Sequence, residues 1–215
     1  QPMTELNRFL HKHPDIRFVD VLLPDLCNVI RGKRLPREDL TKLYESGLQI
    51  PSSIMLLDVT GEGADPGGRG FSDGDPDAIA RPVAGTLQRV PWSDTPVGQV
   101  LAMLYELDGR PCAVDPRHVL TLVSEQLESD GLFPVVALEL EFYLIDSASA
   151  DLGTVQPPIL PISGRSVRAT QVYSINELDE FSGFFEEVSG ACEAQGVPLG
   201  AVSADARMRF FDGRE

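Results

Sequence analysis

The chain has few of the residues and runs that mark several common protein classes. It contains three cysteines and three histidines in 215 residues, and none of them lie at the spacing of metal ligands. An odd number of widely spaced cysteines predicts no disulfide framework and fits a reducing compartment. No apolar run reaches the ~18–20 residues of a membrane span, and no basic-then-apolar leader opens the chain. These absences predict a soluble, cytoplasmic protein with no membrane partner.

Positive charge is also scarce. Eighteen Lys and Arg residues stand against thirty-three Asp and Glu residues, which gives a net charge of −15. This balance argues against nucleic acid as a partner. An acidic surface suits cationic partners, such as metal ions or amines, but it also keeps any protein soluble, and solubility is the safer explanation.

The most informative pattern is a pair of glutamates inside the apolar run 137–144. Successive side chains of a strand point to opposite faces, so Glu139 and Glu141 share one face and the apolar residues share the other. Two carboxylates about 6–7 Å apart repel by roughly 2–3 kcal/mol at an effective dielectric near 20. A divalent cation such as Mg²⁺ or Mn²⁺ would supply the missing counter-charge. A half-exposed antiparallel strand alternates in the same way and is the commoner explanation of the pattern alone.

The segment 61–80 is rich in glycine but does not match a phosphate-binding loop. No Lys-Ser or Lys-Thr follows the glycines, and the segment is acidic. A surface loop is the default interpretation, and a lid or an amine-facing loop is the functional alternative.

Apolar spacing and turn residues predict an α+β protein. The expected strands cover residues 18–23, 29–35, 53–59, 100–107, 110–114 and 137–144, with a further strand starting at residue 201. The expected helices cover residues 4–12, 36–47 and 116–131, and another follows the capping box at Ser174. Asn28 suits a left-handed turn between the first two strands. The organisation predicted is a small α+β unit to about residue 110, followed by a strand–helix–strand–helix unit over 111–215.

Several short motifs resemble the glutamine synthetase family. They run in collinear order over about residues 17–204: Val29–Arg34, Leu57–Gly61, Gly74–Asp77, Gly85–Leu87 with Pro91–Trp92, Asp115–Leu120, Glu139–Phe142 and Tyr173–Asp179. Each motif is weak alone, but the ordered set is specific. The segments around Asp58 and Trp92 are most similar to the γ-glutamylpolyamine synthetase branch.

The resemblance implies a fold and a reaction. The fold would be a β-grasp-like domain over 1–110, followed by the first part of a glutamine synthetase-type catalytic α/β domain over 111–215. The reaction would be ATP-dependent ligation of the γ-carboxyl of glutamate to an amine, a polyamine or ammonia, through a γ-glutamyl phosphate. Mg²⁺ or Mn²⁺ would be the cofactor, and the complete family assembles into homo-oligomeric rings.

The resemblance also implies roles for individual residues. Glu139 and Glu141 would each bind a different divalent metal ion. Asp58 would lie on a loop that reaches a neighbouring subunit's site and holds the incoming amine, and Tyr173 would match an amine-site tyrosine. The structural alternatives are a turn-forming role for Asp58 and a packing role for Tyr173.

The sequence departs from the family after Ala204. The family has two more metal-binding glutamates around a Pro-Gly-Gln turn, whereas this chain has Asp205 and Asp212 at the matching spacing, with Arg207 and Arg209 between them. The two aspartates would be the shorter replacements as metal ligands. The chain has about half the length that the family needs.

Three functional hypotheses follow. The first is a glutamine synthetase-like ligase of which this isolated half is expected to be inactive. The second is a non-catalytic assembly or regulatory relative that retains the oligomerising N-terminal domain. The third is a fold remnant without a ligand.

Overall fold

The computed structural model describes residues 4–70, 72–150, 153, 155–166, 171–204 and 208–212, with the backbone alone for residues 150 and 208–212. By its internal contacts the chain divides into two units, Gln1–Pro134 and Val135–Glu215, and each is described by itself. None of the helices within these described ranges combines the length and apolar character that crossing a membrane requires.

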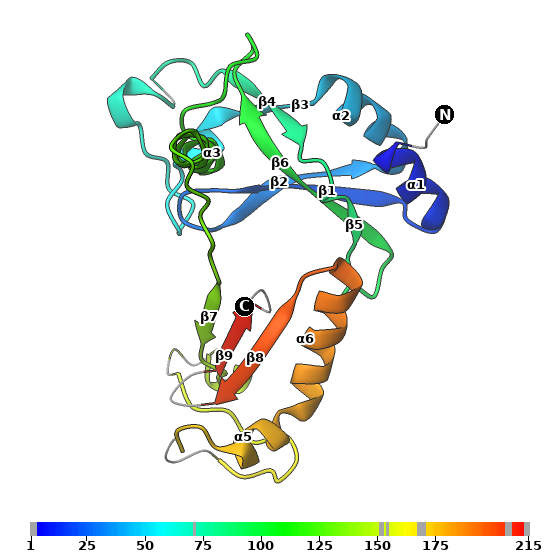
Figure 1. Ribbon diagram of the computed structural model, residues 1–215, viewed down its shortest axis with the longest axis vertical. Helices are drawn as coiled ribbons and strands as arrows, with labels where there is room; N and C mark the ends of the chain where they lie inside the picture. Colours follow the sequence, from blue (N-terminus) through cyan, green and yellow to red (C-terminus); the bar gives the residue numbers. More distant parts are fainter. Residues whose placement is uncertain are drawn as a thin grey trace. The chain divides into compact units, whose positions relative to one another are not determined.

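The first unit is built on a six-stranded sheet (Figure 1). The order is β2-β1-β6-β4-β3, and β5 also pairs with β6. Only the pairing of β1 with β6 is parallel; the other neighbours are antiparallel. The strands are β1 (Phe18–Pro24), β2 (Ile30–Pro36), β3 (Leu48–Pro51), β4 (Asp77–Pro82), β5 (Gln88–Arg89) and β6 (Val97–Tyr105).

Alternating apolar residues explain the position of β1 and β6 in the middle of this sheet. Val19, Val21 and Leu23 of β1 are fully buried, as are Val100, Ala102 and Leu104 of β6, while the residues that alternate with them are partly exposed. Such alternation buries one face of each strand. The predicted hairpin is confirmed, because β1 pairs with β2 from Phe18↔Pro36 to Pro24↔Ile30 and Asn28 has a φ of 59°.

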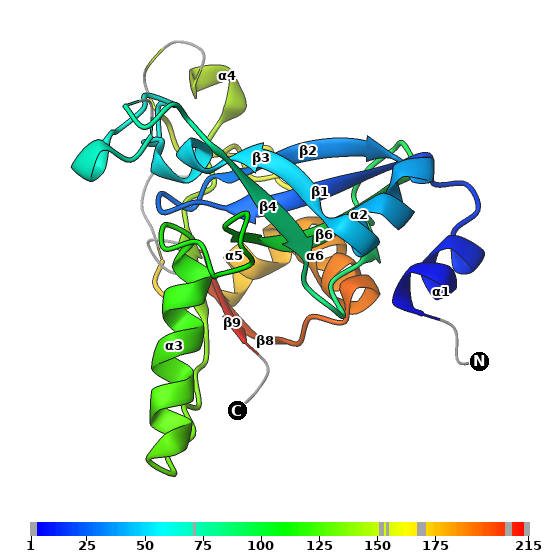
Figure 2. The same cartoon turned by 90° about the horizontal axis from the view of Figure 1, so that it is seen from above.

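The described part of this unit also contains three α-helices. Helix α1 (Glu5–Lys12) starts at Thr4, whose hydroxyl accepts a hydrogen bond from the backbone N–H of Asn7, and α2 (Leu40–Ser46) ends at Gly47 with a φ of 82°. Helix α3 (Pro116–Ser129) lies within the predicted range 116–131, is capped by Asp115 and extends away from the sheet in Figure 2. Its apolar residues Val119, Leu120, Leu122 and Val123 are all more than half exposed.

Two predicted strands of the first unit are wrong. Residues 53–59 do not form a strand; Ser52–Leu56 form a 3-10 helix after β3. Its turn buries Ser52, Ser53, Met55 and Leu56, which is not the two-residue alternation of a strand. The returning strand at 110–114 is reduced to an isolated bridge between Tyr105 and Pro111, since proline has no N–H to extend a ladder.

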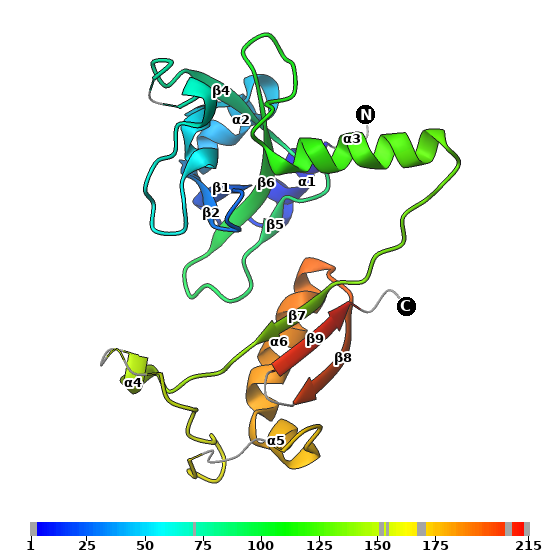
Figure 3. The same cartoon turned by 90° about the vertical axis from the view of Figure 1, so that its left-hand side faces the viewer.

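The second unit contains a three-stranded antiparallel sheet, β7 (Glu139–Phe142), β9 (Met208–Asp212) and β8 (Leu199–Ala204), in the order β7-β9-β8 (Figure 3). It also has helices α4 (Ser147–Ala150), α5 (Ile175–Glu180) and α6 (Ser182–Gln195). Leu160, Phe181 and Ala204 form its small core. Leu178 and Phe185, at helical spacing from Phe181, pack against this core.

The observed architecture is mixed α/β, as predicted. The boundary at residue 110 stays a prediction about the family's domains, because the division by contacts falls between Pro134 and Val135 and groups α3 with the first sheet.

Candidate functional site

Asp58 lies on a tight loop, residues 57–63, which we call the Asp58 loop. A bridge between Leu57 and Gly63 closes its base. Within it, the backbone N–H of Asp58 donates to the Glu62 carbonyl at 2.9 Å, and the N–H of Gly61 donates to the Asp58 carbonyl at 3.1 Å. These bonds fix the backbone that carries the Asp58 side chain.

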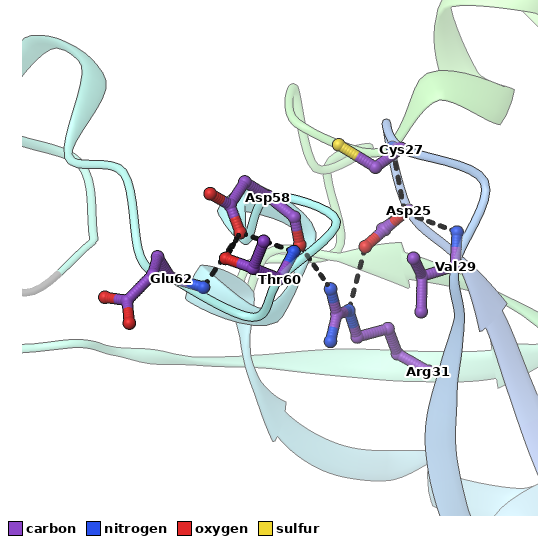
Figure 4. Close-up of polar contacts among 7 residues, drawn as sticks. All are labelled: Asp25, Cys27, Val29, Arg31, Asp58, Thr60 and Glu62. Carbon is purple, nitrogen blue, oxygen red and sulfur yellow. Dashed lines mark hydrogen bonds and ion pairs between the residues drawn. The ribbon is translucent and has the colours of Figure 1, made fainter. Parts of the chain in front are cut away.

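The carboxylate of Asp58 uses one oxygen to organise this loop. Its Oδ1 accepts hydrogen bonds from the backbone N–H of Thr60 at 2.8 Å, the Thr60 hydroxyl at 2.7 Å and the N–H of Glu62 at 2.9 Å. The second oxygen points away from these donors in Figure 4. The hydrogen bond from the Thr60 hydroxyl, followed by that from the Glu62 backbone, lowers the pKa of Asp58. Because the exposed Asp58 carboxylate is held as an anion, its second oxygen can attract a cationic ligand. Oδ1 has the turn-forming role that the sequence offered as the alternative.

A second carboxylate, Asp25, organises the turn between β1 and β2. Its Oδ1 accepts hydrogen bonds from the backbone N–H groups of Cys27 and Val29, both at 2.8 Å, and its Oδ2 accepts one from Arg31 Nε at 2.8 Å. Burial raises the pKa of Asp25, but the hydrogen bonds from Val29, Arg31 and Cys27 outweigh it, and the pKa lies below its ordinary value.

Arg31 links this turn to the Asp58 loop. While its Nε bonds Asp25, its Nη2 donates to the backbone carbonyl of Asp58 at 3.0 Å (Figure 4). The sequence placed Arg31 in a family-like run but gave it no role, because no local pattern signals a contact between residues 27 positions apart.

Glu139 and Glu141 lie on one face of β7, as the alternation predicts, and both are exposed. In the ladder, Glu139 stands opposite Phe211 and Glu141 opposite Arg209. The partly buried residue of the strand is Phe142, which packs against the core of the second unit. Leu140, on the opposite face, is 65% exposed as well, so the strand is not the half-buried one of the alternative. Metal binding by the pair stays a prediction.

The other two predicted metal ligands are Asp205 and Asp212. Asp205 lies outside the described residues. Asp212 is described by its backbone alone, which pairs with Leu199 of β8. Both aspartates stay predictions.

Two same-face carboxylates are the oxygen ligands that Mg²⁺ and Mn²⁺ prefer. Among the residues that the structure describes, no group of three or more His, Cys, Asp or Glu side chains could hold a metal ion. Glu139 and Glu141 therefore fit a partial donor set, to which other ligands must be added before a divalent ion is held tightly.

Tyr173 has an unusual backbone. Its φ is 57° and its side chain is 66% exposed. A left-handed conformation is strained for a bulky residue, and such strain concentrates at functional sites. The next residue, Ser174, caps α5 by accepting a hydrogen bond from the N–H of Glu177 at 3.3 Å. Tyr173 therefore marks an exposed, strained helix entry rather than the packing position of the structural alternative.

The candidate residues fall in both units. Asp58 belongs to the first, and Glu139, Glu141 and Tyr173 belong to the second. The structure establishes the local geometry of each group and leaves their assembly into one site as a prediction.

Comparison with known proteins places these motifs in a family. Residues 113–209 match the glutamine synthetase catalytic domain. The chain is 38% identical over 208 residues to gamma-glutamylputrescine synthetase PuuA of Escherichia coli K12, which covers 97% of this chain and 44% of that protein. The chain belongs to the glutamine synthetase family. It is also 29% identical over 202 residues to a glutamate–isopropylamine ligase of a Pseudomonas species, covering 92% of this chain and 42% of that protein.

Solved structures agree on the fold. A GmaS/ADP complex superposes with a TM-score of 0.71 at 21% identity, over 98% of this chain and 44% of that one. A glutamine synthase homologue gives a TM-score of 0.68 at 18% identity, over 92% of this chain and 43% of that one. The chain thus spans less than half the length of the curated relatives it matches.

Proposed function

We propose that this chain carries the amine-side loop and the first metal-binding strand of an ATP-dependent ligase that joins the γ-carboxyl of glutamate to an amine. The observation that supports this most is the 38% identity to a γ-glutamylputrescine synthetase over nearly the whole chain. The ligases among its relatives act on glutamate by name, and two of the names contain an alkyl amine. An alkyl amine is therefore the proposed co-substrate.

The Asp58 loop would hold that amine. An aliphatic amine is protonated at neutral pH and must lose a proton before it attacks a carbonyl or acyl phosphate. The second oxygen of Asp58 points away from the loop's own donors, so it can accept hydrogen bonds from an ammonium group (Figure 4). Because Oδ1 is fixed by Thr60 and Glu62, the orientation of that second oxygen is set before the ligand arrives.

The strand β7 would serve the phosphoryl-transfer side. A bound divalent ion neutralises phosphoryl oxygens as they accept charge. Glu139 and Glu141 would each donate carboxylate oxygens to such ions. Tyr173 would contact the amine from an exposed helix entry.

The remaining parts of this proposal concern the complete protein. The first sheet would form the family's β-grasp-like domain, with the domain boundary near residue 110. ATP and glutamate would be bound with residues beyond this segment, and the subunits would assemble into a ring. The isolated chain would not turn over, because Glu139 and Glu141 would be only part of a two-metal site, and the described residues contain no group of three or more candidate ligands.

Two measurements on the 215-residue chain test the proposal. Incubation with ATP, glutamate and putrescine should release no phosphate above background, and sustained putrescine-dependent release would contradict the predicted inactivity. Calorimetric titration with Mn²⁺ should show binding that weakens in Glu139→Gln and in Glu141→Gln. Glu186→Gln, on exposed helix α6, is the control. Mn²⁺ binding that is equally strong in the wild type and in both variants would remove the metal role of the pair.

The second candidate function is a non-catalytic assembly or regulatory partner of a full-length relative. It is favoured by α3, which presents exposed Val119, Leu120 and Leu122 on a unit that has its own continuous core. Light scattering of the chain mixed with a full-length relative should then show a complex, and two separate species would exclude it.

A further inference from the structure

We infer that Arg31 is a positioning residue, which holds the Asp58 loop against the turn between β1 and β2 and so fixes the direction of the Asp58 carboxylate. The inference depends on the proposed function in one respect only, which is that Asp58 binds the amine. The contacts that support it belong entirely to the first unit.

The guanidinium uses two different nitrogens for two different segments. Nε donates to Asp25 Oδ2 at 2.8 Å, and Nη2 donates to the Asp58 carbonyl at 3.0 Å. The planar fork of arginine holds such donors at fixed mutual angles. The hydrogen bond of Nε to Asp25 therefore determines where Nη2 lies, and with it the position of the Asp58 carbonyl.

The anchor on the Asp25 side is rigid. The Asp25 side chain is 0% exposed and that of Arg31 19% exposed, so the pair is largely shielded from water. Asp25 is held in turn by the N–H groups of Cys27 and Val29. A shielded ion pair whose remaining lone pairs are satisfied is far less adaptable than a surface pair.

The Asp58 side depends on this anchor. Apart from its base at Leu57 and Gly63, the loop is held mainly by its own hydrogen bonds, and Asp58, Thr60 and Glu62 are exposed. Arg31 bonds the carbonyl of the residue that carries the carboxylate, so a shift of that carbonyl moves the carboxylate as well. Loops with few buried contacts open more readily than the core, and one external tie has a large effect on them.

Arg31→Lys and Arg31→Met separate this role from neutralisation of Asp25. Lysine carries one nitrogen, which can keep the ion pair with Asp25 but cannot reproduce two donors in a fixed fork. Amide hydrogen exchange measured by NMR should become about tenfold faster at Thr60 and Glu62 in Arg31→Lys, the factor that corresponds to loss of one hydrogen bond of about 1.4 kcal/mol. Exchange at Cys27 and Val29 should stay as in the wild type. In Arg31→Met, both sets should exchange faster.

The carboxyl titration of Asp58, followed by carbon-detected NMR, gives a readout that general support of the fold would not change. The pKa of Asp58 is lowered by donors of its own loop, so in both variants it should rise toward its ordinary value as those donors lose their fixed positions. Arg34→Lys, on the same strand, changes an arginine that pairs with Asp20 and should leave both readouts unchanged.

Several outcomes would overturn the inference. One is unchanged exchange and unchanged titration at Asp58 in folded Arg31→Lys. Another is a uniform increase in exchange over all amides of the first unit, which would make Arg31 a general stabiliser. If Arg31→Met does not fold, Arg31→Lys alone decides. None of these readouts requires catalysis, so a failed ligase assay would count against the proposed function and not against this inference.

Discussion

The buried carboxylate of Asp115 accepts a hydrogen bond from the backbone N–H of Leu104, at 2.8 Å, and so ties the start of α3 to the middle strand of the first sheet. Its other oxygen accepts the N–H of Arg117 at 3.0 Å, as the cap of α3. His118, one turn into the helix, contacts the carbonyl of the same residue Leu104 at 2.6 Å. The helix is thus fixed to both polar groups of one strand residue.

Asp115→Ala should destabilise the first unit by about 3 kcal/mol, because it removes a helix cap and leaves the N–H of Leu104 without its buried acceptor. The free energy of unfolding in urea measures the loss. Asp130→Asn, at the exposed end of the same helix, is the control and should change stability by less than about 0.5 kcal/mol. Equal stability of the two variants would show that the contact with Leu104 contributes little.

Gly32 of β2 should not tolerate a side chain. A Cβ at this position would lie 1.7 Å from the carbonyl oxygen of Val21, and the φ of 149° is itself unfavourable for other residues. Gly32→Ala should therefore cost more than about 2 kcal/mol or prevent folding of the hairpin. Gly109→Ala is the matched control, because its φ is 86° but no atom lies within 4 Å of the new Cβ. A similar melting temperature for both variants would contradict the steric argument.

Local signals explain why much of the first unit could be predicted from sequence. The cap at Asp115 and the left-handed turn at Asn28 depend on residues within four positions of one another, and the structure contains both. A short apolar run is harder, because Met55 and Leu56 suit a strand or a tight helical turn equally well. In the folded protein, tertiary packing favours the helical turn, in which Met55 and Leu56 are both buried.

In the candidate site, too, features set by local sequence could be predicted and features set by tertiary packing could not. The shared face of Glu139 and Glu141 follows from the two-residue period of a strand and could be read from sequence. The contact of Arg31 with the Asp58 carbonyl could not, because it depends on how two separate loops meet.

Acid should weaken the first unit partly through Asp25. Its pKa lies below the ordinary value of 3.8 in the folded protein, so the ionised form is favoured by folding. Its contribution is complete above about pH 5 and is lost as the pH falls below 3.8 and through the lower folded value. Asp25→Asn should cost about 2–3 kcal/mol at pH 7, since it removes one partner of a shielded charged pair.

The pH dependence distinguishes this effect from a simple packing defect. The difference in unfolding free energy between wild type and Asp25→Asn should shrink as the pH falls from 5 toward 3. Asp20→Asn changes an ion pair on the more exposed side of the same hairpin and serves as the control. A difference that stays constant down to pH 3 would exclude the ionised carboxylate as its source.

Tyr173 offers a test of whether strain has been kept for function. Its φ of 57° is costly for an aromatic residue, and its exposed side chain gains little from burial. Tyr173→Gly should therefore leave the second unit unchanged or stabilise it by about 0.5–1 kcal/mol, measured by thermal unfolding. Tyr173→Phe keeps the ring and the strain and should match the wild type. If Tyr173→Gly instead destabilises the unit by more than about 1 kcal/mol, the tyrosine acts in packing, and its proposed contact with the amine loses its structural support.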